Sequence, residues 1–356
     1  MASQVYKDWP AWWWGRLGEI AVSWPTLAIW LCTSRCNAAC RHCYVANRFM
    51  GPELTKEEAL KMVGELAEGG TVHLAFTGGE PFLRPDVLEI AREAVELGLK
   101  VSFNTNGSLV DERLARELRD LDAFVFLSLD GTDREICEAL RGPGSWRGTL
   151  KAVSTLRSYG VEFSIIMTIT SLNYDQGRKH VLLCESVGAW EAIFLPLIPA
   201  GRAAGQGRGL VPKPLQVMEC LRAAEEAAEE VGYRATVWCA PFAVNFARSK
   251  RLYVAPCSEG VADISPQGDL LLCDTLDLKA GNVREGFSKA WEELTAFKER
   301  FLADRDVDDM GPCSNCPVKA YCEGGCLARA LLMAGDVGAP DPLCPRVASS
   351  AGRPAG

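Results

Sequence analysis

The sequence predicts an α/β protein with a partial (β/α)6 barrel and a small cysteine-rich domain after it. Six short apolar segments rich in β-forming residues alternate with amphipathic segments of helical period. Cysteines become denser after about residue 235, where we expect no further long helices. Strands that alternate with helices join into a parallel sheet through right-handed crossovers. Six such units are too few for a closed eight-stranded barrel, so we expect an open side.

The first expected strand covers residues 26–33, and a helix follows that ends near Gly69. Thr55 and Glu58 have the spacing of a capping box, which indicates where this helix begins. The other strands are expected near residues 72–77, 100–104, 123–129, 162–168 and 192–197. The other helices are expected near residues 86–97, 111–119, 147–159, 175–187 and 215–231.

The chain divides into four expected segments. These are a Trp-rich N-terminal segment (1–25), the barrel (26–235), the cysteine-rich domain (236–348) and a disordered tail (349–356). Six of the ten tryptophans lie before residue 31, and we expect their rings to pack over one end of the barrel or to close a substrate cavity. The segment 257–273 predicts a hairpin that turns at Pro266, Gln267 and Gly268.

Composition excludes several classes of protein. The formal net charge of -8 argues against sequence-independent nucleic-acid binding, which relies on clustered Lys and Arg. No apolar run approaches the ~20 residues that span a bilayer, so we expect no membrane partner. Fifteen cysteines without a secretion signal indicate a reducing compartment, and we expect a cytoplasmic protein.

Three cysteines of one run, CNAACRHCY, form the most informative motif. Cys36, Cys40 and Cys43 are spaced so that their thiolates can hold three irons of a 4Fe-4S cluster and leave the fourth without a protein ligand. A zinc site would want a fourth ligand at matching spacing, and His42 is the nearby candidate. A disulfide framework is typical of short secreted chains instead. We therefore interpret the run as an iron-sulfur site.

With Tyr44 directly after the last cysteine, the run resembles the signature of the radical S-adenosylmethionine (SAM) enzymes. The resemblance implies that the open iron chelates the amino and carboxylate groups of SAM. It also implies that an electron passed through the cluster breaks a C–S bond of SAM and releases a 5'-deoxyadenosyl radical. A ferredoxin or flavodoxin-type protein is the implied electron donor.

The same resemblance implies a set of SAM-binding residues, several of which end expected strands. The motif GGEP, with Gly78, Gly79 and Glu80, resembles the one that holds the SAM ammonium group, although a simple strand-ending turn would explain it too. Ser128 is assigned to the ribose or carboxylate and Arg141 to the carboxylate. The remaining assigned contacts are Tyr44, Asn106, which turn chemistry also explains, and Leu195, which is alternatively a core residue near the adenine.

Seven later cysteines resemble the SPASM extension of a subset of radical SAM enzymes, whereas a zinc ribbon would explain only a CxxC pair. The resemblance implies two auxiliary 4Fe-4S clusters, for three clusters in all. The first would be bound by Cys257, Cys273 and Cys326, and the second by Cys313, Cys316, Cys322 and Cys344. The first set lacks a fourth thiol, which either Cys239 or the substrate supplies. We expect an open or exchangeable site there.

Auxiliary clusters can accept the electron that a substrate radical must lose. Asp274, directly after Cys273, matches the position of a proton-accepting Asp in the sulfatase-maturing members, although it is alternatively an acid at a strand end in water. The C-terminal region resembles the pyrroloquinoline quinone and mycofactocin maturases and the haem-pathway decarboxylases. We therefore expect an enzyme that oxidatively modifies a residue of a ribosomal peptide or protein by crosslinking, decarboxylation or side-chain oxidation.

Two alternative functions remain open: decarboxylation of the propionates of a haem precursor, and a non-catalytic iron-sulfur electron-transfer role. Peptide-modifying relatives often carry an N-terminal module that grips a leader peptide. Only 35 residues precede Cys36, so we expect a separate leader-binding protein or direct recognition of a peptide substrate.

Overall fold

The structure is a computed structural model that describes residues 24–205, 207–257 and 260–350. The expectations for the Trp-rich segment before Trp24 and for the last six residues lie outside the described residues. Trp24 itself donates from Nε1 to Oγ1 of Thr71 at 3.1 Å, and its ring packs 5.1 Å from that of Phe287. This tryptophan therefore joins the start of the barrel to the C-terminal part of the chain.

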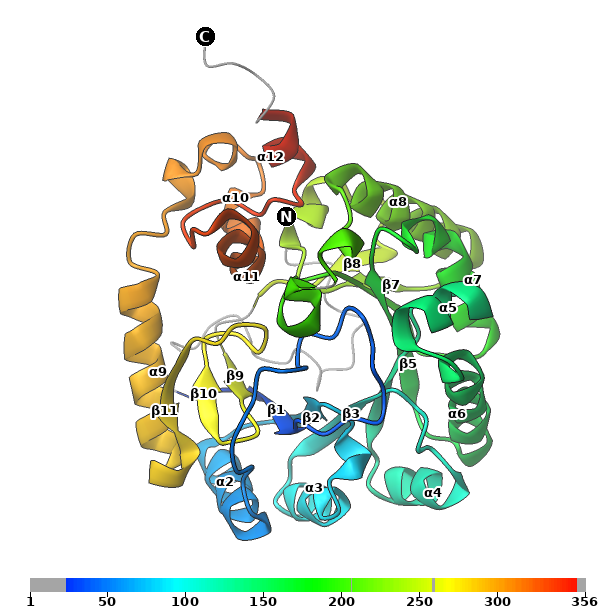
Figure 1. Cartoon of the computed structure of the whole chain (residues 1–356), viewed down its shortest axis with the longest axis vertical. Coiled ribbons are helices and arrows are strands. Elements are labelled where there is room, and N and C mark those ends of the chain that lie inside the picture. The colour runs from blue at the N-terminus through cyan, green and yellow to red at the C-terminus, as the bar shows by residue number, and fades with distance from the viewer. Residues whose placement is uncertain (1–23, 206, 258–259, 351–356) are drawn as a thin grey trace.

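Eight parallel strands, each paired with the next in chain order, form a curved sheet (Figure 1). The first six match the expected strands, and two three-residue strands extend the series. The strands are β1 (Leu27–Thr33), β2 (His73–Gly78), β3 (Lys100–Thr105), β4 (Phe124–Ser128), β5 (Phe163–Ile169), β6 (Ala192–Pro196), β7 (Ala235–Val237) and β8 (Leu252–Val254).

Helices cover the outer face of this sheet, as Figure 1 shows. Thr55 and Glu58 form the expected capping box of the first of them. The expected helices are confirmed, and one eight-residue helix, α5, was not expected. The helices are α2 (Lys56–Gly69), α3 (Val87–Glu96), α4 (Glu112–Asp120), α5 (Arg134–Arg141), α6 (Ser145–Tyr159), α7 (Gly177–Ser186) and α8 (Pro214–Val231).

The sheet continues on the other side of β1 with three strands of the cysteine-rich region. They are β9 (Val261–Ile264), β10 (Asp269–Leu271) and β11 (Lys279–Asn282). Strand β9 runs parallel to β1, with Leu27 opposite Val261, and β9 and β10 form the expected hairpin. The part of the chain that contains the later cysteines is thus hydrogen-bonded directly to the strand that leads into the first cysteine run.

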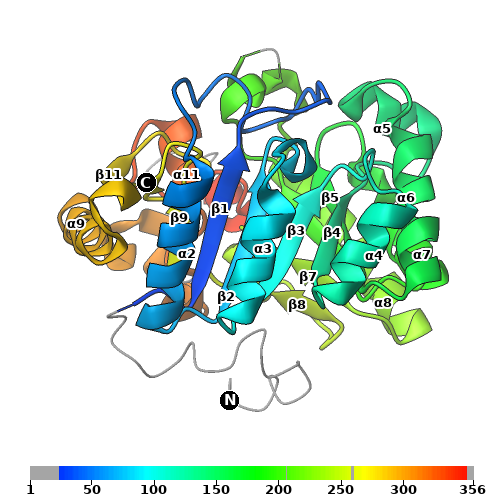
Figure 2. The same ribbon diagram turned by 90° about the horizontal axis from the view of Figure 1, so that it is seen from below.

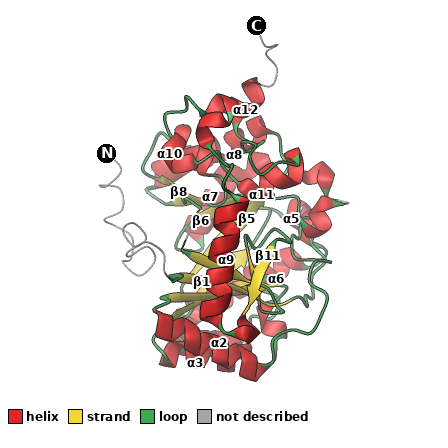
Figure 3. Cartoon of the chain, turned by 90° about the vertical axis from the view of Figure 1, so that its left-hand side faces the viewer, coloured by secondary structure: helices red, strands yellow, loops and turns green. Residues whose placement is uncertain are grey.

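Our expectation that long helices stop after residue 235 is wrong. Helix α9 (Phe287–Phe301) packs along β10 and β11, and Figure 3 shows it beside β11. Its buried face carries Phe287, Trp291 and Leu294 at helical spacing, a pattern that we did not single out among the surrounding charged residues. The later helices are short: α10 (Lys319–Cys322), α11 (Leu327–Arg329) and α12 (Pro345–Ser350).

The main core lies between the sheet and the outer helices, with Trp30, Phe76 and Phe103 fully buried there. Side chains of a strand alternate between the two faces of the sheet. Those on the inner face of the barrel form a separate apolar cluster that contains Phe126 and Leu195. The loop after β1 lies beyond the C-terminal end of that strand (Figure 2). Among the described residues, no helix is long and apolar enough to cross a membrane.

Candidate active site

The first cysteine run lies in the loop between β1 and α2, at the edge where the parallel strands end. Cys36 is exposed, and Cys40 and Cys43 are half-buried, so all three thiols remain accessible to a ligand. Two donors approach them: Nη1 of Arg141 lies 3.8 Å from Sγ of Cys40, and Nδ2 of Asn106 lies 4.0 Å from Sγ of Cys36. These donors favour the thiolates that an iron-sulfur cluster needs, although burial raises the pKa of both Cys36 and Cys40.

Two residues that sequence reasoning missed fix the ends of this loop. Oε1 of Glu53 accepts hydrogen bonds from Oγ1 of Thr33 and from N and Oγ of Ser34 at 2.8–3.0 Å. The buried Arg84 donates to the carbonyl oxygens of Cys32 and Leu54 at 3.1 and 2.9 Å. Arg84 binds backbone carbonyls, and Glu53 binds two hydroxyls and one amide that its position in the chain does not reveal, so neither role has a signature in the sequence.

Gly78 and Gly79 contact the start of the cysteine loop. Gly79 donates from N to the carbonyl oxygen of Thr33 at 2.7 Å, and Gly78 has a φ of +114°. A Cβ on Gly78 would meet the Thr33 carbonyl and one on Gly79 that of Arg35. Glycine is therefore required at both positions for the β2 end and the cysteine loop to pack together.

Glu80 is fully buried and ties β2 to the end of β3. Its carboxylate accepts from Oγ1 of Thr105 at 2.7 Å and from N of Asn106 at 2.9 Å. Burial, partly offset by these hydrogen bonds, raises the pKa of Glu80 above its usual range. Asn106 in turn donates from Nδ2 to Oδ1 of Asn37 at 2.9 Å, so the GGEP and TNG turns and the cysteine loop are connected.

Arg141 lies at the end of α5 beside the cysteine run, and the buried Asp130 holds it there. Its Nε is 2.5 Å from Oδ2 of Asp130, and Nε2 of His42 is 3.0 Å from the same oxygen. Although burial alone would raise the pKa of Asp130, Arg141 and His42 hold it below its ordinary value. Its partners His42 and Arg141 are not apparent from the sequence, because the fold brings them together.

A turn after β6 (Gly201–Ala204) covers the second half of the cysteine run. Arg202 donates from N to the carbonyl oxygen of Cys43 at 2.9 Å and from Nη1 to that of Cys40 at 2.6 Å. Gly201 has a φ of +54°, and a Cβ there would meet the carbonyl oxygen of Tyr44. Sequence reasoning missed both residues, because they too recognise backbone atoms.

Ser128 and Leu195 both lie near the carboxyl ends of their strands. Ser128 ends β4 and is half-buried, at the same edge as the cysteine loop. Leu195 packs with Phe126, Ile166 and Trp238 in the apolar cluster of the inner face. Leu195 is half-buried on this inner face, and its position beside the adenine stays a prediction.

Tyr44 points away from the cysteine loop toward the C-terminal region. Its hydroxyl is hydrogen-bonded to Asp274 and Thr77, and burial is the main cause that raises the pKa of Tyr44 well above its usual value. Asp274 also lies beside Asp263, whose carboxylate accepts from N of Asp274 at 3.1 Å. Burial raises the pKa of both carboxyl groups, that of Asp263 to about 8. We had not considered Asp263 from the sequence.

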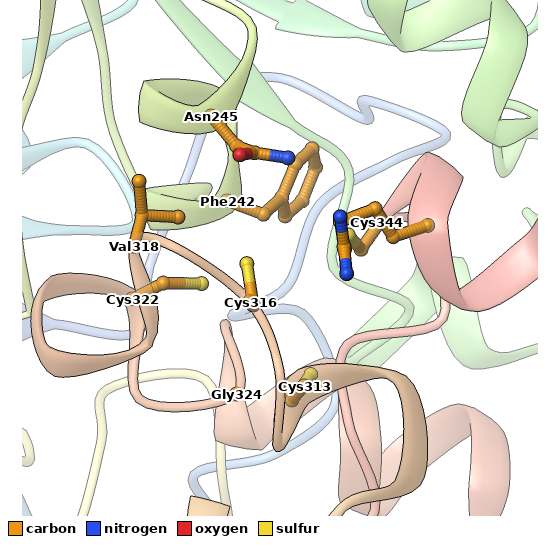
Figure 4. A pocket seen from close by; sticks show the side chains of 9 residues that line it. Phe242, Asn245, Cys313, Cys316, Val318, Cys322, Gly324 and Cys344 are labelled. Carbon is orange, nitrogen blue, oxygen red and sulfur yellow. The ribbon is translucent and has the colours of Figure 1, made fainter.

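The later cysteines form two groups in space. Cys273 and Cys326 belong to one small apolar cluster with Leu272. Cys257 is exposed and precedes β9 by a few residues. The other group lines a pocket with Phe242, Asn245 and Arg346 (Figure 4). Its cysteines are Cys313, Cys316, Cys322 and Cys344. These are the four residues that resemblance assigned to one cluster.

Two glycines shape the turn between the pocket and the first group. Gly324 and Gly325 have φ values of +79° and +86°. A Cβ on Gly324 would meet Sδ of Met310, and one on Gly325 would meet the side chain of Asp341. The close turn lets Cys322 line the pocket while Cys326 packs with Cys273.

The chain is similar to proteins of known function over most of its length. Residues 30–184 match the model of the radical SAM superfamily. An AdoMet-dependent heme synthase of Oleidesulfovibrio alaskensis is 32% identical over 89% of this chain and 86% of its own length. The mycofactocin maturase MftC of Mycobacterium tuberculosis strain H37Rv is 29% identical over 90% of this chain and 83% of its own.

Solved structures show the same fold. Streptococcus suis SuiB bound to S-adenosylmethionine aligns with a TM-score of 0.70, 16% identity and coverage of 91% of this chain and 78% of its own. The protein anSMEcpe with bound AdoMet aligns with a TM-score of 0.69, 22% identity and coverage of 90% and 93%. Together with the family match and the relative above 30% identity, the cysteine run shows that this chain belongs to the radical SAM superfamily and is a radical SAM enzyme.

Proposed function

We propose that Cys36, Cys40 and Cys43 bind the 4Fe-4S cluster that members of this family use with SAM. When bound, cluster and SAM together supply a 5'-deoxyadenosyl radical. Glu80 and the backbone of the GGEP turn would then hold the ammonium group of SAM, and Arg141 would hold its carboxylate. The proximity of Arg141 to Cys40 and of Asn106 to Cys36 supports this assignment.

We infer that two further 4Fe-4S clusters lie in the C-terminal region and carry an electron away from the substrate radical. The observation that supports this best is the pocket lined by four cysteines of the second group. Four thiolates around one space are the ligand set of a 4Fe-4S cluster. Cys273 of the first group directly precedes Asp274, shortly after β10.

The substrate that we propose is a residue of a peptide or protein. A cluster held by Cys257, Cys273 and Cys326 would supply a one-electron acceptor for the radical left by hydrogen-atom abstraction, and Asp274 would take up the proton, so that the two-electron oxidation balances. Burial raises the pKa of Asp274, so its ionised carboxylate is a stronger base, as a proton acceptor should be. Crosslinking, decarboxylation and side-chain oxidation are all compatible with this sequence of steps.

Incubation of the reduced, reconstituted enzyme with SAM and candidate peptides tests the proposal. We expect loss of mass from one peptide in proportion to the 5'-deoxyadenosine formed. Replacement of Cys36, Cys40 or Cys43 by Ala should abolish SAM cleavage. Cys316→Ala should retain some cleavage and lose product, whereas equal loss of both would assign the second group a structural role. A panel that includes peptides encoded beside the gene, none of them changed in mass, would count against a peptide substrate.

Decarboxylation of haem-precursor propionates is the second candidate function, because relatives named AdoMet-dependent heme synthase are 30–32% identical to this chain. Optical titration with an iron tetrapyrrole that bears propionates distinguishes the candidates, and a flat titration removes this one. All three histidines of the chain are buried. A haem precursor would therefore find no exposed imidazole.

We further propose a ferredoxin or flavodoxin-type electron donor and a cytoplasmic location, where thiols remain reduced. A separate leader-binding protein would present the peptide to the enzyme. Mixing the enzyme with such a protein from the same gene neighbourhood should lower the peptide concentration needed for half-maximal turnover.

A further inference from the structure

Four cysteine side chains, and not only the three assigned by resemblance, gather beside the barrel. Cys239, Cys273 and Cys326 all pack against the same small apolar cluster. Burial raises the pKa of the Cys239 thiol, and the neighbouring thiols of Cys257 and Cys326 raise it further. Cys239 thus lies near the thiols of Cys257 and Cys326, and it packs against the same apolar cluster as Cys273.

We propose that Cys239 is the fourth protein ligand of the first auxiliary cluster, so that Cys239, Cys257, Cys273 and Cys326 hold all four of its irons. This inference rests on the auxiliary clusters proposed above and replaces our expectation of an open or exchangeable iron. Binding converts the Cys239 thiol to a thiolate, and the proton leaves to solvent.

The position of Cys239 in the fold supports this assignment. It follows β7, at the edge of the barrel where the cysteine loop also lies. Its φ of +54° is in the left-handed region, which a residue with a Cβ rarely occupies unless its surroundings hold it there. The conformation is therefore imposed by contacts around Cys239.

A buried ion pair provides those contacts and couples Cys239 to Cys326. The guanidinium of Arg329 donates to the carbonyl oxygen of Cys239, and also to that of Pro196 at 3.2 Å. Its partner Asp341 lies 2.6 Å away and accepts from N of Cys326 at 3.0 Å. Since both side chains are fully buried, the pair fixes the backbone of two cysteines from distant parts of the chain in one place.

Asp263 and Asp274 are the alternative candidates for the fourth ligand. Ligand atoms of Asp263, Cys273 and Asp274 all lie within 4.8 Å of one another. Oδ2 of Asp263 accepts from N of Asp274, whereas its buried Oδ1 has no hydrogen-bond partner among the described residues, and Asp274 is hydrogen-bonded to Tyr44. Thiolate, however, is the usual ligand of iron-sulfur clusters. We therefore assign the fourth position to Cys239, which makes the cluster an electron acceptor that does not bind substrate.

The test uses the full chain with Cys36, Cys40 and Cys43 replaced by Ala, so that only auxiliary clusters assemble. After anaerobic reconstitution and reduction, cyanide is added as a small ligand for any open iron, and the electron paramagnetic resonance spectrum is measured. With Cys239 present we expect no change in the spectrum. With Cys239→Gly added, we expect cyanide to shift it. Glycine removes the thiol while suiting the positive φ.

Cys220→Ala in the same background is the matched control, because it removes a buried thiol from α8. It should behave like the parent. Cys239→Ser should alter the spectrum without cyanide, since an oxygen ligand replaces sulfur. A cyanide response with Cys239 intact, or no response in Cys239→Gly, overturns the inference while leaving the auxiliary clusters in place. Absence of iron from the parent would instead refute the auxiliary clusters themselves, and this inference with them.

Discussion

Nε of Arg141 lies 2.5 Å from Oδ2 of Asp130, and Nε2 of His42 lies 3.0 Å from that same oxygen. The Asp130 side chain is fully buried at the end of β4, and its Oδ1 accepts from N of Thr168 at 2.6 Å. One carboxylate thus connects a residue inside the cysteine run to one at the end of α5. The position of Arg141 beside Cys40 depends on it.

We predict that Asp130→Asn weakens both folding and SAM binding. The amide cannot balance the charge of Arg141, and loss of one partner from a buried ion pair costs about 3–5 kcal/mol. We expect a lower unfolding midpoint and a tenfold or greater rise in the SAM concentration at half-maximal 5'-deoxyadenosine formation, as about 1.4 kcal/mol gives tenfold. Asp133→Asn, at the N-cap of α5, is the control, because Asn also caps helices well. An unchanged SAM requirement in Asp130→Asn would mean that Arg141 does not contact SAM.

We predict that Gly79→Ala lowers the iron content of the reconstituted protein. A Cβ at Gly79 would overlap the carbonyl of Arg35, so the start of the cysteine loop must move. Gly64→Ala, in α2 with no atom within 4 Å of the added Cβ, should retain iron and gain up to about 1 kcal/mol of stability. Iron and sulfide assays after identical anaerobic reconstitution measure the difference. Equal iron in the two variants would contradict the requirement for glycine at residue 79.

We predict that Asp274→Asn separates SAM cleavage from product formation. The amide cannot accept the substrate proton, and loss of a general base typically slows the step by about 100- to 10,000-fold. We expect 5'-deoxyadenosine to form while peptide product falls by such a factor. Asp277→Asn is the matched control, because its side chain is 74% exposed and pairs with Arg48. If Asp274→Asn made product at the parent rate, the proton would have another acceptor.

We predict that the buried Glu191 makes the stability of the folded chain depend on pH, independently of the clusters. Its side chain is hydrogen-bonded to Thr236, and burial raises its pKa from 4.5 to about 7. The folded chain therefore binds a proton that the unfolded chain releases at lower pH. Its contribution to stability is complete below about pH 4.5 and is lost as pH rises through about 7. The total change is of the order of 3 kcal/mol.

We predict that Glu191→Gln removes this contribution to the pH dependence and is more stable than the parent at about pH 8, where the parent must bury a charge. Thermal unfolding at about pH 5 and pH 8 at one scan rate measures it. The exposed Glu162 provides the control, and Glu162→Gln should follow the parent at both values. A parent and Glu191→Gln with parallel pH profiles would show that the carboxyl ionises normally.

The sequence predicted the repeating part of the fold well, because strands β1–β6 and their long helices have clear hydrophobic patterns. The three-residue strands β7 and β8 are too short to show a period, and α5 is followed closely by Gly142 and Pro143. The face of α9 was overlooked among its charged residues. Pattern alone therefore found the elements whose burial is regular and missed those that tertiary contacts define.

The candidate site shows a similar division. The cysteines were apparent because this residue type at this spacing indicates iron-sulfur ligands. Glu53, Arg84 and Arg202 were not, since they hold backbone carbonyls and amides that every sequence possesses. The role of Asp130 could be recognised only in the structure, because its partners are distant from it in the chain.

Strand β1 has no free edge among the described residues, since β2 pairs on one side and β9 on the other. A chain that ended before β9 would leave a row of unsatisfied amide and carbonyl groups on the strand that feeds the cysteine run, and such an edge invites aggregation. The C-terminal region is therefore not a detachable accessory. An engineered chain without this region would need another strand paired to β1 on that side to keep the strand and the cysteine loop after it in place.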